Sequence, residues 1–185
     1  MSGYSVELST HLKQLRTSRK LTLNELAEKS GISRATLSRI EKAEASPTAD
    51  TLGALSSAYH LPISALLTPL ENTFEPVVRF ERQPVWQDEL NGFIRRNVSP
   101  PAADLSMELI EGQLRPNQCI AYDKPSMLGQ EHHLMMLEGE LLLTVGSTEY
   151  RLNAGDCVRY KLFESSRYRT LGQAAKYVIA LSKGI

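Results

Sequence analysis

The spacing of apolar residues changes near residue 70, and this change limits what the chain can fold into. Before it, Leu8, Leu12 and Leu15 follow the i, i+4, i+7 spacing of an amphipathic helix. Beyond residue 76, short apolar runs are separated by Gly, Pro and Asn, which is typical of β-strands and turns. Helices followed by strands in one chain predict two separate domains.

The predicted division is a helical domain at residues 1–70, a linker at 71–76 and a β domain at 77–185. The boundary region is polar and flanked by prolines, as expected of a connection between domains. Within the β domain, Gly146 and Ser147 are predicted to form a two-residue hairpin turn. The predicted strands are 77–80, 105–110, 134–137, 141–145, 158–162 and 177–181.

Composition narrows the classes of function. Of the 185 residues, 42% are hydrophobic and 23% are charged, and no apolar run is long enough to span a bilayer. We therefore expect no membrane partner, and the absence of a signal-peptide pattern at the start predicts a cytoplasmic location. The net charge is zero, but residues 1–70 hold eight basic and six acidic residues, which permits DNA binding by this part.

Sequence signals of catalysis are weak. The chain contains no GxSxG motif and no glycine-rich phosphate loop, and its histidines and cysteines are isolated from one another. Cys119 and Cys157 are too few for a disulfide framework and lack CxxC spacing, so each is predicted to be a small buried side chain.

Two short helices are predicted from residue 22 onward. Thr22 and Glu25 have the spacing of a capping box, which opens a helix to about Ser30. Gly31 follows, at a point where the chain must turn sharply, and Ser33 then caps a second helix over Arg34–Glu41. Two further helices are expected after the Thr48 cap and after Pro62.

The second helix has one buried and one exposed face. Leu37 and Ile40 are predicted to point into the core, which leaves a polar outer face suited to the major groove of DNA. Arginine can bind guanine edges, serine can bind several base edges and alanine can contact a thymine methyl group, while Ser33 and Thr36 at the helix start can hold phosphates. The predicted DNA-binding residues are Thr22, Ser33, Arg34, Ala35, Thr36, Ser38, Arg39 and Lys42.

The stretch LTLNELAEKSGISRATLSRIEKAEASPTADTLGALSSAYHLPISALL, residues 21–67, resembles the XRE (Cro-like) helix-turn-helix family. The resemblance implies a five-helix domain whose recognition helix is Arg34–Glu41, with Arg34, Ala35, Ser38 and Arg39 at its base-reading positions. It also implies an ion pair between Arg16 and Glu41. The sequence departs from the family at Leu23, where a glutamine is common, and at Ala43-Glu44, which replaces a glycine. An alternative is a five-helix module that makes only protein contacts, but the arginines on the exposed face favour DNA.

The β domain resembles the cupin barrels that follow such helix-turn-helix domains in bacterial regulators. The resemblance lies in His132-His-Leu-Met-Met-Leu-Glu-Gly139, in Glu140-Leu-Leu-Leu-Thr-Val and in Tyr150-Arg-Leu-Asn-Ala-Gly-Asp156. It implies strands separated by turns at Gly139 and at Gly155-Asp156. The expected fold class is therefore an all-α helix-turn-helix domain followed by an all-β, jelly-roll-type cupin barrel.

The cupin resemblance also allows a test for a metal site. Metal-binding cupins place three histidines and a glutamate on one face, and the matching positions here hold Ser126, Leu128, His132 and Ser166. Only His132 could coordinate a metal, so we expect no metal, no other cofactor and no enzyme activity. One alternative remains, in which a bulge brings Glu131 and His133 onto the same face.

The barrel could instead hold a small molecule. By strand alternation, the residues predicted to line such an effector pocket are His132, Met136, Tyr160, Ser166 and Tyr168. The other reading is that they are ordinary core residues. His133, Arg167 and Arg169 should face the opposite way, toward solvent.

Taken with the two resemblances, these patterns predict a sequence-specific DNA-binding transcription regulator, acting as a repressor. The expected partners are double-stranded DNA, a small-molecule effector and a second copy of the chain in a homodimer. Two alternatives stay open: a cupin enzyme with a regulatory DNA-binding head, and a dimeric regulator that binds no ligand.

Overall fold

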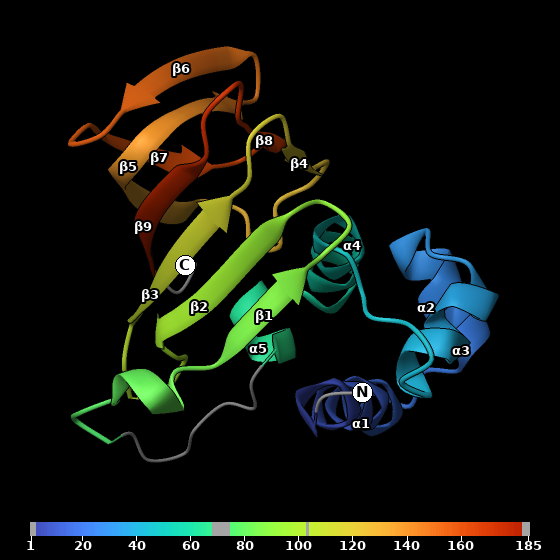
Figure 1. The fold of residues 1–185 in the computed structure, drawn as a ribbon. Coiled ribbons are helices and arrows are strands. Elements are labelled where there is room, and N and C mark those ends of the chain that lie inside the picture. The colour runs from blue at the N-terminus through green and yellow to red at the C-terminus, as the bar shows by residue number, and fades with distance from the viewer. Residues whose placement is uncertain (1–2, 68–74, 103, 183–185) are drawn as a thin grey trace.

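The computed structural model describes residues 3–67, 75–102 and 104–182. Its helices are α1 (Gly3–Ser18), α2 (Leu23–Ser30), α3 (Arg34–Glu41), α4 (Ala49–Tyr59) and α5 (Ile63–Leu67). Figure 1 shows α1, α2 and α3 on one side of the molecule and the sheet on the other. All five helices lie where the sequence predicts them.

The predicted caps fix the ends of α2 and α3. Thr22 accepts a hydrogen bond from the Glu25 N–H at 3.2 Å, and the Glu25 carboxylate accepts one from the Thr22 N–H at 2.7 Å, which completes the capping box. Gly31 ends α2 with a φ of 72°, in the left-handed region that glycine adopts without strain. Ser33 accepts from the Thr36 N–H at 3.1 Å and starts α3.

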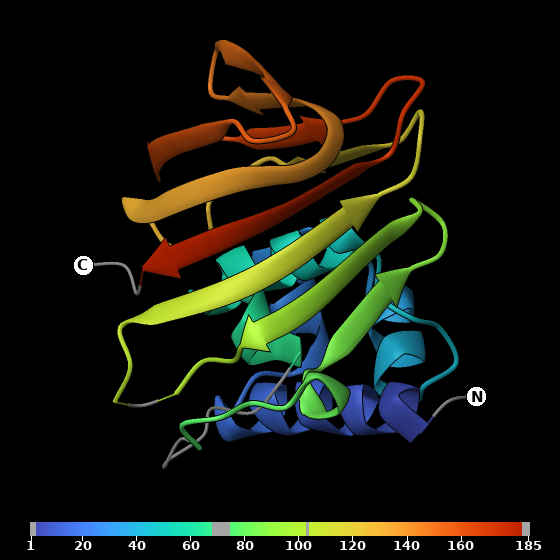
Figure 2. The same ribbon diagram turned by 60° about the vertical axis from the view of Figure 1, so that its left-hand side comes forward.

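The rest of the described chain forms one antiparallel sheet. Its strands are β1 (Val85–Asp88), β2 (Phe93–Ser99), β3 (Met107–Leu114), β4 (Cys119–Tyr122), β5 (Gln130–Val145), β6 (Thr148–Asn153), β7 (Cys157–Leu162), β8 (Ser166–Arg169) and β9 (Ala175–Ser182). The strand order is β1-β2-β3-β9-β5-β8-β4, and β6 and β7 also pair with β5. The sheet curls over α4 and α5 as a cupin-type half-barrel (Figure 2).

The long strand β5 pairs with four other strands and so holds the curved sheet together. Its first half pairs with β7 and β9 and its second half with β6 and β8, with a register shift between Met136 and Glu138. Gly139 has a φ of 75°, and a Cβ there would lie 1.8 Å from the Ala174 carbonyl oxygen, so only glycine fits. The expectation of two strands separated by a turn at Gly139 is therefore wrong, because one strand bends there. The hairpin turn at Gly146 and Ser147 is confirmed.

Two strand predictions need correction. Residues 77–79 are irregular, and Phe80 begins a short 3-10 helix, η1 (Phe80–Arg82), because β1 takes the place beside β2. The strand predicted at 105–110 is part of β3, which begins two residues later, at Met107. The predicted linker at 71–76 lies mostly outside the described residues.

Both cysteines are exposed, so the prediction that they are buried is wrong. Cys119 lies opposite Arg169 and Cys157 lies opposite Met135, and both partners point outward. Since paired residues in adjacent strands share a face, the two thiols are carried to the outside.

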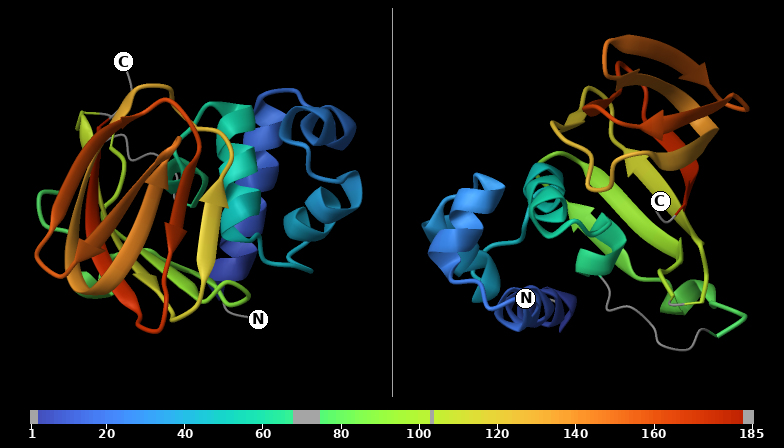
Figure 3. Two further views of the ribbon diagram at one scale, coloured as in Figure 1. Left: turned by 90° about the horizontal axis from the view of Figure 1, so that it is seen from above. Right: turned by 180° about the vertical axis from the view of Figure 1, so that it is seen from behind.

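Helices and sheet are in direct contact. In Figure 3, α4 lies beside β4, with α1, α2 and α3 beyond it. The buried carboxylate of Asp88 accepts a hydrogen bond from the Ala49 N–H at 2.8 Å, at the start of α4. Gly53 in α4 is so close to Tyr122 of β4 that a Cβ would lie 2.5 Å from the ring. Among the described residues, no helix is long and apolar enough to cross a membrane.

Candidate functional site

The outer face of α3 is exposed and basic. Arg34, Ala35, Thr36, Arg39 and Lys42 are exposed, and Ser38 is half-buried. On the opposite face, Leu37 and Ile40 are only 2% and 3% exposed, as the spacing predicts. Ser33 and Thr22 are exposed at the starts of α3 and α2. The structure thus brings the predicted DNA-binding residues onto and around one helix.

An ion pair holds α3 against α1. The Arg16 guanidinium donates to both carboxylate oxygens of Glu41, at 2.7 and 2.8 Å, and also to the Leu21 carbonyl oxygen at 2.7 Å. The hydrogen bonds to Glu41 raise the pKa of Arg16 above its ordinary value. This pair, which the family resemblance implies, is confirmed, and its bidentate geometry fixes the orientation of α3.

After the C-terminal end of α3, Ala43 occupies a position where glycine is usual. Ala43 has a φ of 59°, and the Glu44 N–H donates to the Arg39 carbonyl oxygen at 2.8 Å. This hydrogen bond reaches back five residues, as in the Schellman motif that commonly ends helices at glycine. The turn keeps its shape here with an alanine in the left-handed conformation.

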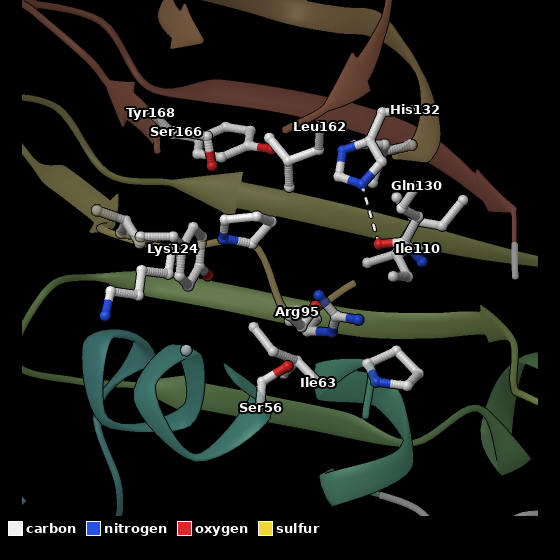
Figure 4. Close-up of a pocket in the computed structure, with 18 of the residues that line it drawn as sticks. Ser56, Ile63, Arg95, Ile110, Lys124, Gln130, His132, Leu162, Ser166 and Tyr168 are labelled. Atoms are coloured by element: carbon white, nitrogen blue, oxygen red, sulfur yellow. Dashed lines mark hydrogen bonds between the residues drawn. The ribbon is translucent and has the colours of Figure 1, made fainter. Parts of the chain in front are cut away.

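A second site lies between the helices and the sheet. Its cavity has a volume of about 80 Å³, which is more than one water molecule needs. The helical wall consists of Gly53, Ser56, Pro62 and Ile63, and the remainder comes from strands of the sheet and from the segment after β4. Figure 4 shows the helix residues Ser56 and Ile63 facing the strand residues across this space.

The structure places three of the five predicted pocket residues in the cavity wall. His132, Ser166 and Tyr168 line the cavity. Met136 is instead fully buried in the core, and Tyr160 is hydrogen-bonded to His132 without lining the cavity. The alternation prediction is confirmed, because His132, Leu134 and Met136 are buried and His133 is more exposed. Arg167 and Arg169 are exposed on β8, as expected.

Several wall residues were missed by sequence reasoning. They include Phe93 and Arg95 of β2, Gln130 of β5, Tyr122 and Tyr177, and the four residues of the helical wall. Polar residues such as Arg95 resemble a solvated face in the sequence, and no local pattern indicates that α4 and α5 cover the sheet. The alternation of Phe93, Arg95 and Asn97 on one side of β2 was the available signal.

A chain of hydrogen bonds fixes His132. The Gln130 side-chain amide donates to the Ser182 carbonyl oxygen at 2.8 Å, so its Oε1 is left to accept from His132 Nε2 at 3.1 Å. His132 Nδ1 is then the acceptor for the Tyr160 hydroxyl at 3.1 Å. Burial, assisted by the positive charge of Arg95, lowers the pKa of His132 to about 4, so the ring is neutral at physiological pH.

Among the described residues, Arg95 is the one arginine in the cavity wall. Its side chain is buried, with the residue 8% exposed, and its Nε donates to Asn97 Oδ1 at 3.3 Å. Its Nη2 is buried and has no hydrogen-bond partner among the described residues. The tyrosines around it are protonated, because burial raises the pKa of Tyr122, Tyr168 and Tyr177.

The residues present do not fit a cupin metal. Ser126 and Ser166 line the cavity beside His132 and cannot replace histidine ligands, while Leu128 is exposed. The alternative of a bulge is wrong, since Glu131 and His133 bind each other at 2.8 Å on the outer face of β5. In the described part of the chain, no three His, Cys, Asp or Glu side chains come together as a metal site requires.

The fold and the exposed helix define a DNA-binding helix-turn-helix protein with a cupin-type sheet. The helix-turn-helix family model matches residues 12–66, which include α2 and α3. The chain is 30% identical over 166 residues to the HTH-type transcriptional regulator SutR of Escherichia coli, covering 90% of this chain and 88% of that protein. It is 28% identical to the E. coli regulator PuuR, covering 84% and 83%.

The chain belongs to this family of XRE-type helix-turn-helix transcriptional regulators, and its partner is DNA. A solved HTH_3 family transcriptional regulator from Vibrio cholerae superimposes with a TM-score of 0.76 at 26% identity, over 97% of this chain and 96% of that one. The iron(II) form of HppE superimposes with a TM-score of 0.51 at 19% identity, over 96% and 98%, which shows a shared fold alone.

Proposed function

We propose that α3 reads DNA bases through Arg34, Ala35, Ser38 and Arg39. The observation that carries this proposal is the exposed basic face of α3, held in place by the ion pair between Arg16 and Glu41. Thr22, Ser33, Thr36 and Lys42 surround that face and contact phosphates, which position the helix without reading sequence. Both arginines are free of ion pairs with other described residues, so their guanidinium groups are available for guanine.

Selection of binding sites from random duplex DNA tests this assignment. The full-length protein should enrich one motif, and Arg34→Ala or Arg39→Ala should lose about 1–3 kcal/mol of discrimination at one position of it. Arg159→Ala removes an exposed arginine from β7 and is the matched control for charge. An unchanged motif in both α3 variants would contradict the assignment.

We infer further that the cavity binds a small-molecule effector. Its supporting feature is the shared wall, in which residues of α4 and α5 face residues of the sheet. A ligand in this position contacts the helical part, residues 1–70, and the β part, residues 77–185, at once. If it binds more tightly to one arrangement of these parts, it changes the affinity for DNA.

The same site supports binding rather than catalysis. The family's metal positions hold two serines and an exposed leucine, and His132 is neutral with both ring nitrogens hydrogen-bonded. The likeness to HppE concerns the fold alone, so it does not carry an enzyme function to this chain.

A homodimer completes the proposal. One chain presents a single recognition helix, whereas helix-turn-helix regulators commonly read two half-sites about one turn of DNA apart. In a symmetric homodimer, the second copy of the chain supplies the second recognition helix, so no other protein is needed.

A further inference from the structure

Arg95 is a buried cation that forms no ion pair with any described residue. The ion pairs made by arginines in the described residues involve Arg16, Arg82, Arg96, Arg151 and Arg169, and none of them involves Arg95. Its Nε donates a hydrogen bond to the neutral Asn97, and its buried Nη2 has no partner among the residues that the structure describes. The next residue, Arg96, points to the other face of β2, where Glu111 lies 3.6 Å away and the Phe80 ring lies 4.1 Å from the guanidinium.

A buried charge without a counter-charge is costly to a folded protein. Buried arginines are therefore usually paired, and an exception calls for a physical explanation. Arg95 lines the cavity between the sheet and the helices, and Figure 4 shows its guanidinium among the residues that surround this space. A ligand entering the cavity can therefore supply the missing negative charge.

The other residues of the cavity wall indicate how much negative charge a ligand should carry. Besides Arg95, the buried polar groups of the cavity are neutral: Ser56, Gln130, His132 and Ser166. Lys124 also lines the cavity, but it is exposed. One buried guanidinium balances one negative charge, and a planar carboxylate matches its hydrogen-bonding geometry. A phosphate with two charges would leave one of them unbalanced.

Apolar side chains occupy much of the remaining wall. Ile63 reaches the cavity from α5, while Phe93, Ile110 and Ile120 reach it from the sheet. A short aliphatic or aromatic group attached to the carboxylate would contact both sides. This arrangement, with a single buried charged group within a largely apolar lining, is typical of small-molecule sites.

We propose that the cavity binds a small monocarboxylate whose carboxylate pairs with Arg95 while its apolar part packs between α5 and the sheet. This inference rests on the proposed effector function and names the class of effector. The ligand would tighten contacts that already join α4 to the sheet, such as the hydrogen bond between Ala49 and Asp88. Because α4 follows α3 through the loop at 42–48, the position of the recognition helix would depend on the bound acid.

Thermal unfolding of the full-length protein tests the proposal with paired probes. The probes are straight-chain acids from acetate to hexanoate and benzoate, each compared with its own neutral amide at equal ionic strength. At a hundred times the dissociation constant, the best acid should raise the unfolding temperature by about 5–10 °C, and its amide should not. The absence of any difference between acid and amide would overturn the proposal.

Arg95→Met should abolish the difference between acid and amide. Arg96→Met removes the neighbouring guanidinium from the opposite face and should preserve it. Without ligand, Arg95→Met should unfold at a higher temperature than the wild type, because the variant no longer buries an unpaired charge. A lower unfolding temperature would show that Arg95 is a structural residue, and an acid effect retained in Arg95→Met would exclude it as the anchor.

DNA binding by the wild type separates this inference from the proposed reading of DNA. If the protein selects a DNA motif but no acid stabilises it more than its amide, the ligand class is wrong and the DNA assignment stands. If an acid stabilises the protein and no motif is selected, the DNA assignment fails and the anion site stands. An acid that binds without changing affinity for the selected duplex would overturn the coupling through α4.

Discussion

Ala43 occupies a backbone conformation that favours glycine. Its φ of 59° lies in the left-handed region, where a Cβ crowds the following carbonyl oxygen. The hydrogen bond from the Glu44 N–H to Arg39 nevertheless closes the end of α3. The residue therefore lowers stability at a helix that we propose reads DNA.

Ala43→Gly should stabilise the protein by about 0.5–1 kcal/mol, because the strain is relieved at a modest cost in unfolded-state entropy. Urea unfolding of the full-length chain measures the difference. Ala54→Gly, inside α4, is the matched control and should destabilise by a similar amount, since glycine weakens a helix interior. A loss of stability in Ala43→Gly would contradict this account of the turn.

His132 makes stability depend on pH. Its pKa is lowered to about 4 by burial and by Arg95, whereas an unfolded chain has its histidine pKa near 6.5. As the pH falls below about 6.5, the unfolded chain binds the proton first, so stability falls until about pH 4 and then no further from this residue. The full change is about 3 kcal/mol.

Replacing His132 by glutamine should remove its contribution to the pH dependence of stability. The difference in unfolding free energy between wild type and His132→Gln should vary across pH 4–6.5 in favour of the wild type at the higher pH. Parallel profiles for wild type and His132→Gln would show that the folded protein does not disfavour the charged ring.

At the scale of elements, the ion pair between Arg16 and Glu41 joins α3 to α1. The two side chains are only 12% and 9% exposed, so removing one partner leaves a largely desolvated charge behind. Arg16→Met should therefore cost about 3 kcal/mol of unfolding free energy. The double variant Arg16→Met with Glu41→Leu should recover part of this loss.

An exposed pair provides the comparison. Arg151 in β6 contacts Glu140 at 2.7 Å with 67% of its side chain exposed, so Arg151→Met should cost less than about 1 kcal/mol. Equal costs for the two arginines in denaturant unfolding would show that the Arg16 pair does not anchor α3.

The helices were predictable from the sequence because their signals are local. Thr22, Glu25, Gly31 and Ser33 determine the ends of α2 and α3 through bonds within a few residues. Strand β2 was missed, because Arg95, Arg96 and Asn97 make it look like a polar loop, although its alternation carries the cavity face. The bend of β5 at Gly139 depends on Ala174, which lies far along the chain.

At the scale of the whole molecule, the cavity is formed by segments that are distant in sequence. Sequence alternation predicted His132, Met136, Tyr160, Ser166 and Tyr168 as pocket lining, and the structure places three of them, His132, Ser166 and Tyr168, in the wall. The opposite wall, from α4 and α5, depends on the packing of helices against the sheet, for which no local pattern exists. The unpaired Arg95 could likewise be recognised only once its surroundings were known.

Helix α4 lies between the proposed ligand cavity and the helices that carry the proposed DNA-reading face. The cavity touches α4, and α4 lies between the sheet and the helices α1, α2 and α3 (Figure 3). The ligand site and the proposed DNA-reading helix are thus separated by one helix and its connecting loop. Coupling between them requires that the ligand bind the DNA-competent and DNA-incompetent arrangements with different affinities.

Hydroxyl-radical footprinting of the full-length protein on its selected duplex tests the central claim most directly. If two copies of α3 read adjacent half-sites, two segments on one face of the DNA are protected, with centres about 10 base pairs apart. Arg34→Ala and Arg39→Ala should weaken both segments together. A single protected segment, or protection that survives in both variants, would contradict the account of a dimer that reads DNA through α3.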